Sequence, residues 1–279
     1  MTPINRTDNE TRSADMIAQN IEILKRLFPE AVSEGRLDLS VLKGLIGTSL
    51  LPDEERDEKY GLNWFGKRKA QQIALTPSTG TLRPCKEDSV DWDTTKNLMI
   101  EGDNLEVLKL LQKSYAGQVK LIYIDPPYNT GKDFVYPDNF QDNIRNYLEL
   151  TGQVEGGAKM QSNTESSGRF HTDWLNMMYP RIKLAKNLLD SDGVFFVSID
   201  ENEASNLRLI CDDIFGEENF VGWITRATGT PTGGGNKAIV NEVDYLIVYS
   251  KSTEMNVEGL PMTEDDSWIY DQEDEWGKF

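Results

Sequence analysis

Apolar residues recur near the N-terminus at the spacing of amphipathic helices. Residues 14–28 place apolar side chains on one helical face, at Met16, Ile17, Ile21, Leu24 and Phe28. Residues 38–46 predict a second, shorter helix. The charged stretch 52–61 and the turn-rich stretch 76–89 are typical of solvated loops or linkers. The pattern therefore predicts an N-terminal helical region and linker over residues 1–85.

After this region, short apolar runs alternate with helical patterns. Strands are predicted at 97–100, 119–124, 193–199 and 244–251, and helices at 104–115, 174–189 and 202–216. Strands that alternate with helices favour a parallel α/β sheet. The run 193–199 is apolar throughout, as in a strand that is covered on both faces. We therefore predict an α/β fold for residues 86–255 and an acidic following segment over 256–279.

Local signals set the expected ends of these elements. Asn104 is the candidate N-cap of its helix, and Gly193 is expected just past the end of the helix over 174–189. Pro180 should kink that helix or divide it in two. The first three strands end in polar or acidic residues, including Asp103 and Asp125. Open α/β sheets bind their ligands at this edge.

Composition is that of an ordinary globular protein, with 279 residues, 38% hydrophobic and 27% charged. No apolar run reaches about 18 residues and the N-terminus is polar, so we expect no membrane partner, no secretory signal and a cytoplasmic location. Cys85 and Cys211 lie far apart, and the single histidine, His171, argues against a His-rich zinc site; no metal is expected. The net charge of −18 argues against a phosphate-tracking surface, but charge does not decide the fold.

The strongest chemical signal is the turn Asp125-Pro126-Pro127-Tyr128 after a predicted strand. Asp125 offers a carboxylate, and the prolines, which lack an N–H, leave backbone carbonyls free to accept hydrogen bonds. Tyr128 adds a flat ring, and stacking on such a ring is worth roughly 1–3 kcal/mol per base. This set suits a planar heterocycle with an exocyclic amino group, because two acceptors can take both amino hydrogens and free the nitrogen lone pair. A base in a duplex would have to be flipped out first.

The turn is similar to the catalytic motif of amino-methylating DNA methyltransferases, in which Asp at the first position favours adenine N6 over cytosine N4. A wider set of segments resembles the modification subunits of bacterial type III restriction–modification systems, at 61–74, 78–90, 97–115, 122–140, 174–203 and 210–221. Phe65 stands where a proline is expected, and we attach no function to it.

The resemblance implies an adenine in DNA as methyl acceptor and S-adenosylmethionine as donor. Asp125, Pro126, Pro127 and Tyr128 would be the catalytic set: Asp125 and the Pro126 carbonyl hold the amino group, and Tyr128 stacks on the flipped base. Asp103 would contact the adenosine part of the cofactor, with Asp125 also in the cofactor site. The alternative role for Asp103 is a helix cap.

The family also implies a Rossmann-like S-adenosylmethionine-dependent methyltransferase sheet. The glycine-rich cofactor motif of this permuted class is not found, so we expect the sheet to be incomplete in this chain and the chain to be an N-terminal part. The implied partners are double-stranded DNA with a flipped adenine, a second modification subunit and the restriction subunit.

Other interpretations remain open. The chain could be an inactive fragment that only binds its missing half, the modification dimer or the restriction subunit. An RNA or protein amino-methyltransferase is disfavoured by Asp125, since protein-methylating relatives tend to carry Asn there. Cys85 is interpreted as structural, because it precedes the α/β region. Solvated surface roles are preferred or equally open for Lys132, Asp200, Glu201 and His171.

Overall fold

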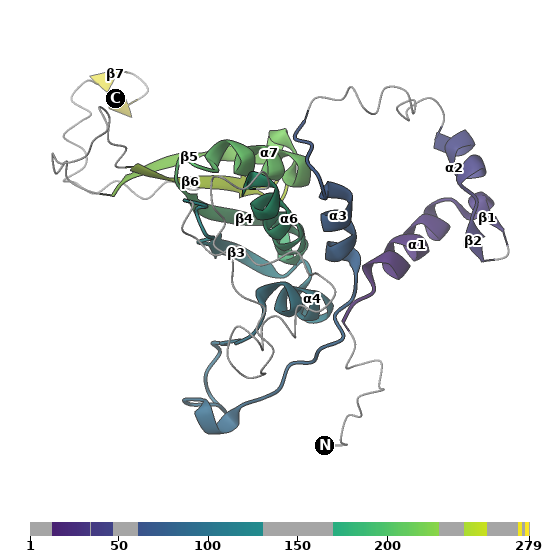
Figure 1. Cartoon of the computed structure of the whole chain (residues 1–279), viewed down its shortest axis with the longest axis horizontal. Helices are drawn as coiled ribbons and strands as arrows, with labels where there is room; N and C mark the ends of the chain where they lie inside the picture. The colour runs from purple at the N-terminus through teal and green to yellow at the C-terminus, as the bar shows by residue number, and fades with distance from the viewer. Residues whose placement is uncertain are drawn as a thin grey trace.

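The computed structural model describes residues 13–33, 35–46, 61–130, 170–228 and 243–255, together with the backbone of 273–274 and 277–278. The helices are α1 Met16–Leu27, α2 Leu39–Ile46, α3 Lys67–Leu75, α4 Asn104–Tyr115, α6 Phe170–Leu188 and α7 Ala204–Phe215. The main strands are β3 Val119–Ile124, β4 Leu189–Ile199, β5 Phe220–Ala227 and β6 Val243–Ser250. Two short ladders pair β1 Val32–Ser33 with β2 Arg36–Leu37, and β7 Glu273–Asp274 with β8 Gly277–Lys278. Single 3-10 turns lie at Pro29–Ala31, Lys86–Asp88 and Glu217–Asn219. The α/β fold class predicted from the sequence is confirmed (Figure 1).

The main sheet has the strand order β3-β4-β6-β5 and is mixed, not parallel. β3 runs parallel to β4, with Ile122 opposite Phe195. β6 is antiparallel to both of its neighbours, and Tyr249 lies opposite Phe195 of β4. The predicted all-parallel sheet is therefore wrong at β6, which returns between β4 and β5. Hydrophobic patterns specify that a segment is a strand, whereas orientation follows from its hydrogen-bonded neighbours.

Several predicted element ends also differ from the structure. Residues 97–100 pair with no strand among the described residues, and Leu98 and Met99 are exposed, because an apolar run forms a strand only where a neighbour accepts its hydrogen bonds. Gly193 lies inside β4, since α6 passes directly into that strand at Leu188. Pro180 lies within α6 without dividing it. The predicted helices over 14–28, 38–46, 104–115 and 202–216 are confirmed by α1, α2, α4 and α7.

One face of the sheet forms the core. Phe195, Val197 and Ile199 of β4, with Ile247 and Tyr249 of β6, are fully buried on this face. They pack against α6 and α7 in a single apolar cluster, in which Phe195 stacks on Phe215 with ring centroids 5.4 Å apart. α3 and α4 pack in turn against α6. Helix α6 is therefore buried along most of its length, which makes it a rigid support for whatever lies at the end of β3.

The opposite face of the sheet is less covered. Burial along β4 alternates between buried and half-buried side chains, so the predicted cover on both faces is not found within the described residues. Leu121, Tyr123 and Ile224 on this face are 56%, 54% and 52% exposed. β3 is also an edge strand of the described sheet.

The N-terminal helices lie apart from the sheet. Figure 1 shows α1 and α2 on the far side of α3 from the sheet. Helix α3 precedes the predicted boundary near residue 85, yet its Ala70 packs in the same apolar cluster as α6. The division at residue 85 stays a prediction. Among the described residues, no helix has the length and apolar character needed to cross a membrane.

Candidate active site

The Asp125-Pro126-Pro127-Tyr128 turn lies at the carboxyl end of β3, as predicted. The indole Nε1–H of Trp174 on α6 donates to the Pro127 carbonyl at 2.7 Å. Trp174 is completely buried, whereas Asp125 is exposed. The Pro127 carbonyl is therefore used inside the protein, and the Asp125 carboxylate faces outward, where a guest can reach it.

The Tyr128 hydroxyl faces the carboxylate that precedes it. Burial, followed by a hydrogen bond to Asp125, raises the pKa of Tyr128 to about 12. Ser198, near the end of β4, also hydrogen-bonds Tyr128, and the Tyr123 hydroxyl lies 2.7 Å from Ser198 Oγ. Tyr128 is therefore protonated at neutral pH and donates a hydrogen bond to Asp125. Sequence reasoning missed Ser198 and Tyr123; the available signal was a serine near the end of an otherwise apolar strand.

Further charged groups gather at the same edge of the sheet. The guanidinium Nη2 of Arg226 on β5 lies 2.8 Å from Oδ2 of Asp244 on β6. Burial, with added repulsion from Glu201 and Asp244, raises the pKa of Asp200. Both oxygens of Asp200 accept hydrogen bonds from Asn202, at 2.9 Å from its backbone N and 2.7 Å from its amide. Asp200 thus closes a local turn and is half-buried.

Asn129 follows Tyr128 and ends the turn in an unusual conformation. Its φ is 61°, in the left-handed region that few non-glycine residues adopt. The side chain is fully buried, and its Nδ2 donates to Glu203 Oε1 at 2.5 Å and to the Phe170 carbonyl at 3.3 Å. The residue after the catalytic motif is therefore held by groups from two distant segments.

Glu203 is the centre of this arrangement and was not singled out from the sequence. It is 0% exposed and precedes α7. Its Oε1 also lies 2.6 Å from Nδ1 of His171 in the first turn of α6, and its Oε2 accepts from Asn206 Nδ2 at 2.7 Å. No sequence pattern marks Glu203, because two of its three partners, Asn129 and His171, lie 74 and 32 positions away in the chain.

Asp103 is the N-cap of α4. Its Oδ1 accepts from the backbone N of Glu106 at 3.0 Å, so Asp103 caps the helix where Asn104 was predicted to do so. Its Oδ2 lies 3.8 Å from Nη2 of Arg181 on α6, whose Nε donates to Asn104 Oδ1 at 2.6 Å. The capping role is thus confirmed, and the cofactor role stays a prediction.

Helix α6 relates Asp103 to the catalytic turn. Trp174 holds the Pro127 carbonyl, and Arg181 reaches Asp103 seven residues later along the same helix. Seven residues of α-helix span about 10 Å. The Asp103 side chain and the Pro127 carbonyl therefore contact α6 at residues seven positions apart.

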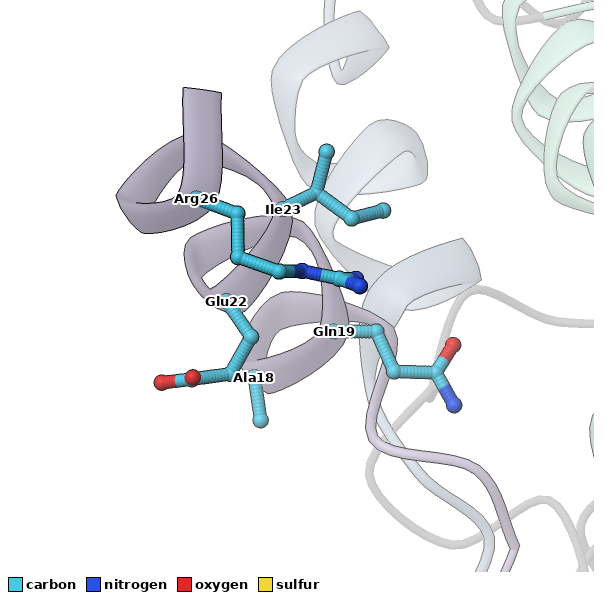
Figure 2. A pocket seen from close by; sticks show the side chains of 5 residues that line it. All are labelled: Ala18, Gln19, Glu22, Ile23 and Arg26. Atoms are coloured by element: carbon cyan, nitrogen blue, oxygen red, sulfur yellow. The ribbon is translucent and has the colours of Figure 1, made fainter. Parts of the chain in front are cut away.

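Other candidate features lie away from this site. A shallow depression on α1 is lined by Ala18, Gln19, Glu22, Ile23 and Arg26, all from that one helix (Figure 2). No three potential metal ligands cluster within the part of the chain that the structure describes. Cys85 is exposed, and burial raises the pKa of the Cys211 thiol. Lys132 lies outside the described residues.

The sequence match to a known family covers most of these elements. The family model described as DNA methylase matches residues 119–278, which is more than half of the chain. The chain therefore belongs to the DNA methylase family.

Within that class, the chain is similar to modification subunits of type III restriction–modification enzymes, which confirms the predicted resemblance. It is 38% identical over 242 residues to the EcoP15I Mod subunit of Escherichia coli, covering 85% of this chain and 37% of that protein. It is 36% identical over 243 residues to the EcoPI Mod subunit of Escherichia phage P1, covering 85% and 37%. The chain thus spans a little over a third of the length of these relatives.

Two solved methyltransferases match the chain weakly, with TM-scores below 0.5 and low sequence identity. A complex of M1.HpyAVI with S-adenosylmethionine matches with a TM-score of 0.34 and 15% identity, covering 59% of this chain and 60% of that chain. The cytosine-N4-specific PvuII DNA methyltransferase matches with a TM-score of 0.32 and 14% identity, covering 52% and 47%. The sequence match, rather than this structural similarity, assigns the family.

Proposed function

We propose that this chain is the catalytic part of a site-specific DNA methyltransferase that transfers a methyl group from S-adenosylmethionine to adenine N6 in a restriction–modification system. One observation carries the proposal. In a chain of the DNA methylase family, an exposed Asp125 carboxylate accepts a hydrogen bond from the Tyr128 hydroxyl at the carboxyl end of β3. This edge is where open α/β sheets bind their ligands.

The turn would hold the amino group of a flipped adenine. The Asp125 carboxylate gives up its hydrogen bond from the Tyr128 hydroxyl and accepts one amino hydrogen of the base. The Pro126 carbonyl accepts the other amino hydrogen. The amino nitrogen then moves toward tetrahedral geometry, and its lone pair becomes available for a direct displacement. Tyr128 stacks on the base, worth roughly 1–3 kcal/mol. Asp125 is the nearest acceptor for the proton that the nitrogen loses after transfer.

The residues present fit S-adenosylmethionine, which supplies an electrophilic methyl group on a sulfonium. One oxygen of Asp103 accepts the helix-cap hydrogen bond. The other faces Arg181 on a side chain that is 8% exposed, and it would accept from a ribose hydroxyl. Asp125 lies at the reacting end. The proposed cofactor site therefore extends along α6 from Asp103 to the turn that contains Asp125.

The proposed partners are double-stranded DNA, a second modification subunit and a restriction subunit, in the cytoplasm. The EcoP15I and EcoPI relatives are subunits of type III restriction-modification enzymes, which supports this assignment. The net charge of −18 means that affinity for phosphates must come from local basic groups or from other parts of a longer protein.

A second candidate function is a binding module without activity of its own. The exposed apolar face around Leu121, Tyr123 and Ile224, next to the open edge of β3, favours it. The two candidates share a fold and differ in whether the chain by itself binds the cofactor.

The test is calorimetry of S-adenosylmethionine binding to the 279-residue chain, beside Asp125→Ala and Asp103→Ala. Methyl transfer from labelled cofactor to adenine in DNA is measured on the same samples. Micromolar binding that Asp103→Ala abolishes, with transfer that Asp125→Ala abolishes, supports the methyltransferase. Absence of binding, with binding restored by adding the remaining part of a modification subunit, supports the binding module. Transfer to cytosine but not adenine would contradict the proposed acceptor.

A further inference from the structure

Glu203 is a buried carboxylate whose position has no explanation in helix capping. It occupies the N-cap position of α7, yet its side chain accepts no capping hydrogen bond from that helix. Removing a charge from water is costly unless it is paired and hydrogen-bonded. Glu203 instead directs its carboxylate to Asn129, His171 and Asn206. Two of these three partners, Asn129 and His171, lie outside α7, so the buried acid links α7 to other segments of the fold.

A carboxylate suits this position for a chemical reason. Three side-chain nitrogens from three segments converge on its two oxygens, within 2.5 to 2.7 Å. An ionised carboxylate is an acceptor only, so it satisfies all three donors at once. A glutamine of the same shape has one acceptor oxygen and one donor amide, so all three contacts persist only if Asn206 or His171 reorients to present an acceptor.

The contact with Asn129 leads directly to the catalytic turn. Asn129 comes immediately after Tyr128 and adopts a φ of 61°, which asparagine tolerates but does not favour. Its buried amide is held by Glu203 and by the Phe170 carbonyl. Trp174 holds the Pro127 carbonyl two residues earlier. The turn is therefore anchored at Pro127 by α6 and at Asn129 by Glu203, the residue that precedes α7.

We propose that Glu203 is a positioning residue for the catalytic turn: through Asn129 it sets where Asp125 and Tyr128 stand relative to the flipped base. Glu203 is fully buried and acts without touching the substrate. The inference rests on the proposed methyltransferase function, because only that function requires the turn to hold a defined geometry. His171 is the exposed member of the cluster and holds the same Glu203 oxygen from α6.

The main test compares Glu203→Gln with Glu201→Gln, an exposed acid two residues away, in the 279-residue chain. With the folded fraction matched by circular dichroism, we expect Glu203→Gln to lower kcat for adenine methylation roughly 10- to 100-fold, the scale of a small misplacement of reacting groups. KM for S-adenosylmethionine should stay within about twofold, because the cofactor's adenosine contact is remote. Glu201→Gln should match the wild type.

A second variant keeps the proposal testable if Glu203→Gln does not fold. Asn129→Gly removes the amide but suits a positive φ, so the backbone can keep its path. Asn129→Gly should reproduce the loss of kcat. The double variant Glu203→Gln/Asn129→Gly should be no slower than the slower single variant, because both substitutions remove the same Glu203–Asn129 contact. A wild-type kcat for Asn129→Gly, or effects that multiply in the double variant, would overturn the proposal.

A spectroscopic readout separates this proposal from the proposed function. The indole N–H of Trp174, assigned in nitrogen-15 spectra with Trp174→Phe, reports the position of Pro127 without any substrate. Of the six tryptophan indoles, that of Trp174 should shift most in Glu203→Gln and in Asn129→Gly, and none should shift in Glu201→Gln. If the wild type shows no transfer activity but these shifts occur, the proposed function fails and the positioning contact stands. An unchanged Trp174 signal refutes the contact.

Discussion

Replacing Trp174 with phenylalanine tests whether the catalytic turn is fastened to the core. The indole Nε1–H donates to the Pro127 carbonyl at 2.7 Å, and the ring is completely buried between α6 and the sheet. Phenylalanine keeps an aromatic ring but has no donor. The substitution therefore removes one hydrogen bond and leaves a carbonyl facing an apolar ring.

Two contributions determine how much the free energy of unfolding should fall in Trp174→Phe. Leaving a buried acceptor without its partner costs about 1–3 kcal/mol. The smaller ring adds roughly 1 kcal/mol for contacts that the surroundings cannot fully restore. We expect the free energy of unfolding to fall by about 2–4 kcal/mol, which lowers the folded-to-unfolded ratio roughly 30- to 700-fold.

Urea unfolding followed by far-ultraviolet circular dichroism measures this change. Trp223→Phe is the matched control, because Trp223 is 41% exposed on β5, and its substitution should change stability by no more than about 0.5 kcal/mol. If Trp174→Phe costs no more than Trp223→Phe, the reasoning that links the turn to the core through this indole is wrong.

Three further sets of variants test the separate roles of Asp103, Tyr128 and Gly66. Asp103→Asn should retain the helix cap, with stability within about 0.5 kcal/mol of wild type, while weakening S-adenosylmethionine binding in calorimetry; Asp103→Ala should lose about 1 kcal/mol as well. Equal cofactor affinity in Asp103→Asn would remove Asp103 from the cofactor site. Tyr128→Phe should keep methyl transfer within about tenfold of wild type, and Tyr128→Ala should lose roughly 10- to 100-fold through stacking. The pKa of Tyr128 in the folded protein is raised to about 12. The stability that the Tyr128 hydroxyl contributes is therefore present below about pH 10, the ordinary tyrosine pKa, and is lost as pH rises toward 12. The stability difference between wild type and Tyr128→Phe, measured in urea at pH 9 and 11, should therefore shrink at the higher pH; a constant difference would contradict the shift. Gly66→Ala should cost about 1–3 kcal/mol in thermal unfolding, since Gly66 has a φ of 102° and a Cβ there would lie 2.6 Å from the Asn176 amide. Gly44→Ala, in open space on α2, should instead stabilise by about 0.5–1 kcal/mol, and equal effects of the two glycine variants would refute the steric argument.

The asymmetric burial of the sheet bears on any preparation of this chain. Leu121 and Tyr123 project from edge strand β3, with apolar Val194 and Phe196 half-buried beside them on β4. An open edge next to an apolar face promotes pairing with other strands. Calorimetry and kinetics on the 279-residue chain therefore need its association state measured by sedimentation at the same concentration.

Features that depend on neighbouring residues could be predicted from the sequence. The apolar spacing in α1, α2, α4 and α7 and the apolar run of β3 act through contacts a few residues apart, so periodicity predicts them. The catalytic turn could also be predicted from the sequence. Its two prolines, its acid and its tyrosine are consecutive residues, so their combined chemistry does not depend on a distant partner. The type III resemblance followed from the order of such local segments.

Tertiary structure decided what depends on partners far along the chain. The antiparallel direction of β6 follows from hydrogen bonds to β4 and β5, and residues 97–100 form no strand within the described sheet because no neighbour pairs with them. Glu203 meets Asn129 across 74 positions and His171 across 32. The burial of Glu203 depends on how α6 and α7 pack. Neither the side chain of Glu203 nor its neighbours in the sequence indicate this burial.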